Sequence, residues 1–233
     1  MLTPMARCWL CQQSLYDSHH GICSHCLRHL PQPPVCCPRC GLPAANRVLP
    51  CGRCLQHPPA WHSLLLVGDY QPPFNQLIWH FKLQGKTELA PALARLLLMC
   101  WLERRRQMAL TRPDDLPRPD ILLTVPLHRW RHWRRGFNQS DLLARHLAHW
   151  VGCAYHPDGL ARTRNTAQQR TLPAAARRRN LKGAFKCRMA LDGKRVALLD
   201  DVVTTGSTVE EISRILLAAG AAQVQIWCLC RTL

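Results

Sequence analysis

One segment, Val196–Thr208, constrains the fold of this chain more than any other. It begins with four apolar residues, continues with the adjacent carboxylates Asp200 and Asp201, and ends in a turn of threonine, glycine and serine. The apolar run indicates a buried strand of a parallel sheet, and the turn indicates the start of a helix. Ligands bind such sheets beyond the carboxyl ends of the strands, so both carboxylates are predicted to face a ligand crevice. The alternative is that the two acids have no ligand. This is disfavoured, because burying two adjacent carboxylates costs free energy of hydration unless another group pairs with them.

The turn after the carboxylates is predicted to bind an anion. Its backbone N–H groups and hydroxyl groups lie at a helix start, where phosphate-like groups bind readily, and its glycine allows close approach. The spacing of Ser207 and Glu210 also matches a capping box, which predicts that Ser207 is the N-cap of the helix. The candidate anion-binding residues are Thr204, Thr205, Gly206, Ser207 and Thr208.

Four Cys-x-x-Cys pairs within the first 56 residues predict a metal-binding region. Eleven residues separate the first pair from the second, and ten separate the third from the fourth. Each pair offers two thiolates to one side of a tetrahedral ion, so we expect two structural zinc ions, each held by four cysteines. Pairing in sequence order is favoured over an interleaved arrangement, and disulfides are disfavoured in a reducing cytoplasm. The candidate ligands are Cys8, Cys11, Cys23, Cys26, Cys37, Cys40, Cys51 and Cys54.

From Trp61 onward, strands alternate with helices, a pattern typical of an α/β fold with a parallel sheet. We predict two domains, a double zinc ribbon over residues 1–56 and an α/β domain over residues 61–233. The expected strands cover residues 64–70, 121–125, 195–199 and 223–229, and the expected helices cover residues 73–82, 88–107, 138–150 and 208–219. Lys82, in the first of these helices, is interpreted as a solvated residue. No secretory signal or long apolar run is present, so a cytoplasmic protein without membrane insertion is expected.

Positive charge is concentrated in one part of the chain, whose formal net charge is +17. Between Val125 and Ala190, 14 lysines and arginines stand against Asp141 and Asp158 alone. Such a surplus predicts a polyanionic partner. An arginine-rich solvated surface is the alternative.

Two segments of this basic region carry candidate contact residues. The first leaves the strand expected at residues 121–125, where arginines could clamp a pyrophosphate and interleaved aromatic rings could stack on the bases of a single strand. Core aromatics in an amphipathic turn are the alternative. The second, residues 162–170 followed by 177–180, is expected to be mobile without ligand and to close over pyrophosphate or grip nucleic acid. The candidates are Arg134, Arg135, Gly136, Arg162 and Arg164 for pyrophosphate or nucleic-acid contact, and Trp130, Trp133 and Phe137 for stacking.

The run from Asp200 to Thr208 resembles the ribose-5-phosphate signature of type I phosphoribosyltransferases. This resemblance implies that the paired acids hold the ribose hydroxyls of phosphoribosyl pyrophosphate (PRPP), that the turn holds its 5-phosphate, and that magnesium bridges its pyrophosphate. With the four cysteine pairs, RRGFNQ at Arg134–Gln139 and RTRNTAQQ at Arg162–Gln169, the chain resembles the competence protein F family (ComF/GntX) over essentially its whole length. That resemblance implies a double zinc ribbon fused to a type I phosphoribosyltransferase-like domain, and a role in DNA uptake or the nutritional use of extracellular DNA.

Three functions follow from these features. The favoured one is a DNA-handling protein that binds single-stranded DNA and PRPP, with DNA-uptake machinery at the inner membrane as a partner. The alternatives are phosphoribosyl transfer to an unidentified small acceptor and PRPP sensing without catalysis. Catalysis is left open because only a few residues, ending in 231–233, follow the last expected strand, so a segment that recognises an acceptor base would have to come from residues 61 to about 110.

Overall fold

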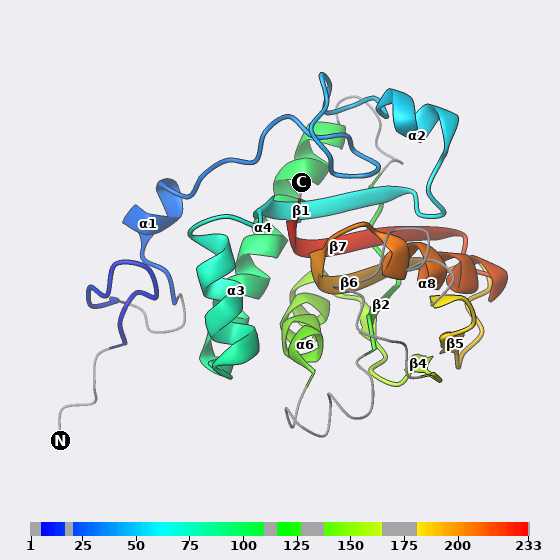
Figure 1. The fold of residues 1–233 in the computed structure, drawn as a ribbon. Coiled ribbons are helices and arrows are strands. Elements are labelled where there is room, and N and C mark those ends of the chain that lie inside the picture. Colours follow the sequence, from blue (N-terminus) through cyan, green and yellow to red (C-terminus); the bar gives the residue numbers. More distant parts are fainter. Residues whose placement is uncertain (1–5, 17–20, 110–115, 127–137, 165–180, 233) are drawn as a thin grey trace.

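Five parallel strands form the central sheet of the computed structural model, which describes residues 6–16, 21–109, 116–126, 138–164 and 181–232 (Figure 1). The order of the strands is β1-β7-β6-β2-β3, and every neighbouring pair is parallel. Their bounds are Ser63–Asp69 for β1, Ile121–Thr124 for β2, Ala154–Tyr155 for β3, Arg195–Val203 for β6 and Gln223–Arg231 for β7. The strands β6 and β7 lie inside the sheet, which explains why apolar residues dominate both sequences.

Helices cover both faces of the sheet. Three helices share a buried cluster with one face, and α8 shares another with the opposite face. The helices on the first face are α3 Phe74–Leu83, α4 Ala90–Ala109, which follows the short 3-10 turn η2 Thr87–Leu89, and α6 Gln139–Val151; α8 covers Ser207–Ala218.

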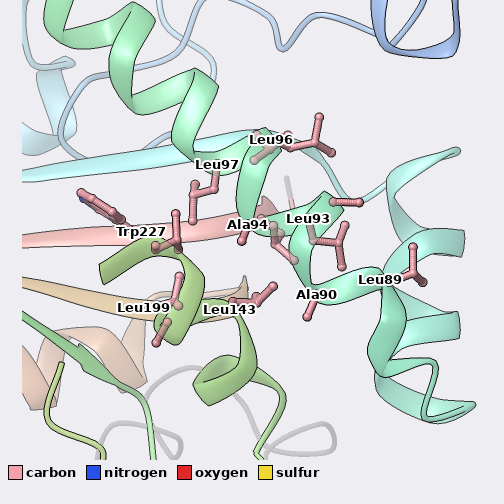
Figure 2. Close-up of a cluster of buried hydrophobic side chains, with 14 of the residues drawn as sticks. Leu89, Ala90, Leu93, Ala94, Leu96, Leu97, Leu143, Leu199 and Trp227 are labelled. Carbon is pink, nitrogen blue, oxygen red and sulfur yellow. The ribbon is translucent and has the colours of Figure 1, made fainter. Parts of the chain in front are cut away.

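Alternating side chains of the central strands fill the two cores, because neighbouring residues of a strand face opposite sides. Leu199 belongs to the cluster under α4 and α6, whereas Leu198 belongs to the cluster under α8. Figure 2 shows Leu97 of α4 and Leu143 of α6 gathered about Leu199 and Trp227 of the sheet. This two-sided packing leaves the ends of the strands as the places where polar side chains can gather.

Short elements complete the fold. The strands β4 Leu160–Arg162 and β5 Phe185–Cys187 form an antiparallel pair, in which Arg162 lies opposite Phe185. The helices α1 Ser24–Arg28 and α2 Gly52–Gln56 each follow an N-cap cysteine, Cys23 and Cys51 respectively.

Both cysteine-rich segments pack against the α/β core. Cys8, Leu15 and Ile22 belong to the cluster that contains α3 and α4. Gly21 has a φ of +63°, and a Cβ built there would lie 2.8 Å from the Cβ of Ala92 in α4. Gly41 has a φ of +69° and lies against β1, because its Cβ would be 2.6 Å from the side chain of Leu64. Glycine is therefore required at both positions by conformation and by space.

The expected long elements are all present, within a few residues of the predicted bounds. The predicted strand at 195–199 continues to Val203, so Asp200 and Asp201 lie within β6 rather than after it. The capping-box prediction is wrong: Gly206, at a φ of +81°, is the N-cap of α8, and no side chain caps this end. The two- and three-residue strands β3, β4 and β5 were not predicted.

Candidate functional site

The carboxyl ends of β2 and β6 form the point at which the connections of the sheet diverge. The strand β2 connects through α6 to β3 on one side, whereas β6 connects through α8 to β7 on the other. In open parallel sheets, a ligand crevice forms at such a switch point. The backbone N–H of Val125 donates to the carbonyl of Leu199 at 3.0 Å, so β2 ends beside the residue that precedes Asp200. The topology therefore places both carboxylates beside the switch point.

The two carboxylates are held by their own backbone. Asp200 Oδ1 accepts from the N–H of Asp201 at 2.9 Å, and Asp201 Oδ1 accepts from the N–H of Val202 at 2.7 Å. Burial raises the pKa of Asp200 to about 7, and the charge of Asp201 adds to this shift, whereas Lys82 opposes it. Carboxylates whose pKa is raised by burial and by a neighbouring like charge are common at functional sites.

Lys82, in the last turn of α3, is a site residue that the sequence did not reveal. Its Nζ lies 2.5 Å from Oδ2 of Asp201, and the two side chains are 30% and 12% exposed. The interpretation of Lys82 as a solvated residue is therefore wrong. No local pattern could have found it, because the ion pair joins residues far apart in the sequence. The pair fixes the end of α3 to the carboxylates.

A network of buried polar residues at the start of α6 forms the neighbouring wall. Asn138 is the N-cap of α6 and accepts from the N–H of Ser140 at 3.2 Å. Asp141 Oδ1 accepts from Nδ2 of Asn138 at 2.9 Å and from Oγ1 of Thr124 at 2.7 Å. The amide of Gln139 donates to the carbonyl of Lys82 at 3.3 Å. These bonds join β2, α6 and α3 into one frame, which contacts Asp201 through Lys82.

The turn after β6 presents hydroxyl groups and backbone N–H groups at the start of a 12-residue helix. The hydroxyls of Thr205 and Ser207 lie 2.9 Å apart, and the N–H of Ser207 lies 3.4 Å from Oγ1 of Thr205. Thr204 and Thr205 are exposed, whereas Gly206 is buried. The positive end of a helix dipole with accessible donors is suited to bind an anion.

The remaining basic and aromatic candidates are only partly described. Arg162 lies on β4, and its guanidinium carbon is 5.6 Å from the centre of the Phe185 ring on β5. Arg164 is exposed beyond the end of β4. The other candidates lie outside the described residues: Trp130, Trp133, Arg134, Arg135, Gly136 and Phe137.

The eight paired cysteines form two clusters of four. In each cluster all sulfur atoms lie within 4.8 Å of one another, and the grouping follows the sequence order that was favoured. The first cluster contains Cys8, Cys11, Cys23 and Cys26, and the second contains Cys37, Cys40, Cys51 and Cys54.

One sulfur in each cluster lies where its thiolate form is favoured, whereas burial and the neighbouring thiols raise the pKa of Cys26 and Cys54. Burial acts to raise the pKa of the Cys8 thiol, but hydrogen bonds, chiefly from backbone N–H groups, outweigh it and lower the pKa to about 6. The same balance lowers the pKa of Cys37 to about 7, and the N–H of Cys51 donates to its sulfur at 3.3 Å. Thiolates are the form that binds a metal ion, so both clusters could hold one.

Comparison with known proteins identifies similar sequences along the whole chain. The family model described as phosphoribosyl transferase domain matches residues 143–233, which include β6, α8 and β7. Over the full length of both chains, this protein is 53% identical to DNA utilization protein YhgH of Salmonella typhi. It is 36% identical to Competence protein F of Haemophilus influenzae, over 97% of this chain and 96% of that relative. It is 27% identical to Competence protein ComFC of Bacillus subtilis, over 84% of this chain and 78% of that relative. With the parallel sheet and the cysteine clusters, these findings confirm the predicted fold class.

The raised pKa of Asp200 leads to a prediction about how the stability of the protein depends on pH. Folded Asp200 has a pKa of about 7 against an ordinary value of 3.8, so its ionised form is disfavoured by folding. Asp200→Asn is expected to raise the free energy of unfolding most above pH 7, with a gain that shrinks as the pH falls from 7 and vanishes well below 3.8, where both the folded and the unfolded wild type are protonated. Urea unfolding across this range measures it. Asp158→Asn, at an exposed position, is the control. If both variants gain the same free energy of unfolding, or if the gain of Asp200→Asn does not depend on pH, the raised pKa of Asp200 is contradicted.

Proposed function

The chain belongs to the competence protein F (ComF) family, and from this premise we propose that it handles DNA for uptake or for the nutritional use of extracellular DNA. We infer that it binds single-stranded DNA and PRPP on its phosphoribosyltransferase-like domain. The observation that carries the proposal is the carboxylate pair on β6, next to a turn that is suited to bind an anion, at the switch point of the sheet. The names of the relatives, which refer to DNA utilization and competence, support the choice of DNA as the partner.

In this proposal, PRPP binds along the end of β6. Asp200 and Asp201 accept hydrogen bonds from the ribose hydroxyls. The 5-phosphate accepts hydrogen bonds from the turn residues Thr204, Thr205, Gly206, Ser207 and Thr208. Asp200 and Asp201 could hold magnesium, which prefers oxygen ligands and would supply positive charge to the pyrophosphate of PRPP. The raised pKa of Asp200 supports this arrangement, because a bound cation would relieve the repulsion between the two carboxylates.

The proposed DNA contacts come from the basic region between Val125 and Ala190. Phosphates of DNA or the pyrophosphate of PRPP would be contacted by Arg134, Arg135, Arg162 and Arg164. Gly136, which follows Arg135, would allow a tight turn there. The rings of Trp130, Trp133 and Phe137 would stack on bases. The surplus of positive charge in this region supports a polyanionic ligand.

We propose that the two cysteine clusters hold structural zinc. Four sulfur ligands in a tetrahedral set are typical of zinc, and a closed set leaves no open position for chemistry. Zinc would stabilise segments that contain few apolar residues of their own. Residues 1–56 would then form a double zinc ribbon docked on a domain of residues 61–233.

Metal analysis tests the zinc proposal. We expect about two zinc ions per purified chain by mass spectrometry, and about one in Cys54→Ser, because three sulfurs hold a structural ion poorly. Cys153→Ser, which changes a cysteine outside both clusters, should keep both ions. Wild-type protein without zinc, or with iron in its place, would contradict the proposal.

Phosphoribosyl transfer to a small acceptor is a second candidate, favoured by the match of residues 143–233 to the phosphoribosyl transferase domain. PRPP sensing without catalysis is a third and needs only the binding turn. Release of pyrophosphate from PRPP with candidate bases and amines distinguishes them, since only a transferase releases it.

We also propose a cytoplasmic location, with DNA-uptake machinery at the inner membrane as a partner. Among the helices of the described residues, none has the length and apolar character needed to cross a bilayer.

Fluorescence anisotropy of a labelled single-stranded oligonucleotide tests the DNA contacts. Arg134→Ala/Arg135→Ala is expected to bind more weakly than wild type, with a slope of log affinity against log salt that is smaller by about 1.4, because two phosphate contacts are lost. PRPP with magnesium should change the wild-type affinity if the two ligands share the basic segment.

The control for this measurement is Arg105→Ala/Arg106→Ala, which removes the same charge from exposed positions on α4. Oligonucleotide binding that is equal in wild type and the Arg134/Arg135 variant, or equally weakened in both variants, would remove these arginines from the DNA site.

A further inference from the structure

The second cysteine cluster is connected to the anion-binding turn by residues to which the preceding sections give no role. We propose that Trp61 is a positioning residue that couples this cluster to the turn Thr204–Thr208, so that metal binding by the cluster raises the affinity for PRPP. The inference rests on the proposed function, in which this turn binds the 5-phosphate.

One indole ring contacts both elements. Trp61 is 5% exposed, and its Nε1 donates to the carbonyl of Arg39 at 2.6 Å. Arg39 lies between Cys37 and Cys40, so its carbonyl belongs to the loop that a metal ion would fix. On its other side, Cη2 of Trp61 lies 3.2 Å from the position of a Cβ on Gly206. The ring is thus packed against the left-handed residue that begins α8.

A second link lies one residue earlier in the chain. The N–H of Ala60 donates to Oε2 of Glu210 at 3.0 Å, in the first turn of α8. The other oxygen of Glu210 accepts from Nη2 of Arg214 at 2.7 Å, which holds the carboxylate in place. The segment between the second cluster and β1 is therefore attached to the same helix start that forms the turn.

A third link joins the second cluster to the end of β7. Gly41 directly follows Cys40, and a Cβ there would lie 3.3 Å from Cδ of Arg231. Arg231 is 5% exposed, and its Nε and Nη1 have no hydrogen-bond partner within the described residues. It pairs in register with Val203, the residue before Thr204. Four thiolates on a divalent ion carry net negative charge, which would compensate this buried cation and hold the end of β7 beside the turn.

The first cysteine cluster has a different setting. Its Gly21 packs on Ala92 of α4, and Trp9 lies with its ring centre 6.4 Å from that of His80 on α3. These contacts lie on the face of the sheet opposite to α8. The structure therefore assigns the coupling to the second cluster.

The test measures PRPP affinity by calorimetry, with magnesium, in wild type, Trp61→Phe, Cys54→Ser and the double variant. Trp61→Phe keeps a ring but removes the donor to Arg39, and we expect affinity to fall about threefold to tenfold, the range of one hydrogen bond. Cys54→Ser should have a similar effect. The double variant should be no weaker than the weaker single variant, because both changes interrupt one route.

The matched control is Trp101→Phe. Trp101 is also buried, but its Nε1 has no hydrogen-bond partner within the described residues, so its loss should leave PRPP affinity unchanged. Hydrogen exchange gives a second readout: in Trp61→Phe, amides of residues 204–208 should exchange faster, whereas in Trp101→Phe they should not.

The outcomes separate the two proposals. If wild type binds PRPP but Trp61→Phe binds it equally well, or if the effects of Trp61→Phe and Cys54→Ser add, the coupling is overturned while the PRPP site stands. If wild type does not bind PRPP, the proposed function fails and the coupling fails with it. Wild-type binding, weaker binding in Trp61→Phe and a non-additive double variant together support both.

Discussion

Two adjacent carboxylates at the end of a buried strand are the constraint on which the rest of the structure depends. Asp200 and Asp201 repel each other, and burial raises the pKa of Asp200 further. Lys82 compensates part of this charge through its ion pair with Asp201. The hydrogen bonds of Gln139 and Asp141 join α6 to α3 and to β2, and so hold the helix that carries Lys82. The free protein thus keeps a charge imbalance that a ligand carrying a metal ion would relieve.

The cysteine-rich segments are part of this arrangement. The first packs on α3 and α4, and α3 carries Lys82 to the carboxylates. The second packs on β1 and on the end of β7, and it reaches the turn after β6 through Trp61. Both segments therefore contact elements that form the candidate site. Metal binding by the second cluster and ligand binding at the turn would therefore share one scaffold.

The sequence predicted the parts of this structure that depend on local patterns. Apolar runs predicted the long strands and helices, and regular Cys-x-x-Cys spacing predicted two clusters in sequence order. Sequence patterns did not predict the features that depend on contacts between residues far apart in the chain. The Lys82–Asp201 pair has no local signature, and Glu210 bonds to Ala60 instead of capping its own helix. The strands β3, β4 and β5 have at most three residues, too few to show a period.

Calorimetric titration of PRPP, with and without magnesium, into wild type and Asp200→Asn/Asp201→Asn tests the central claim most directly. Binding that requires magnesium in wild type and is lost in the variant is the expected result, because the neutral amides keep the shape of the site but remove its charge. The variant must remain folded, as shown by its thermal unfolding. Equal binding in both proteins, or no binding to wild type, would contradict the claim that this carboxylate pair forms a PRPP site.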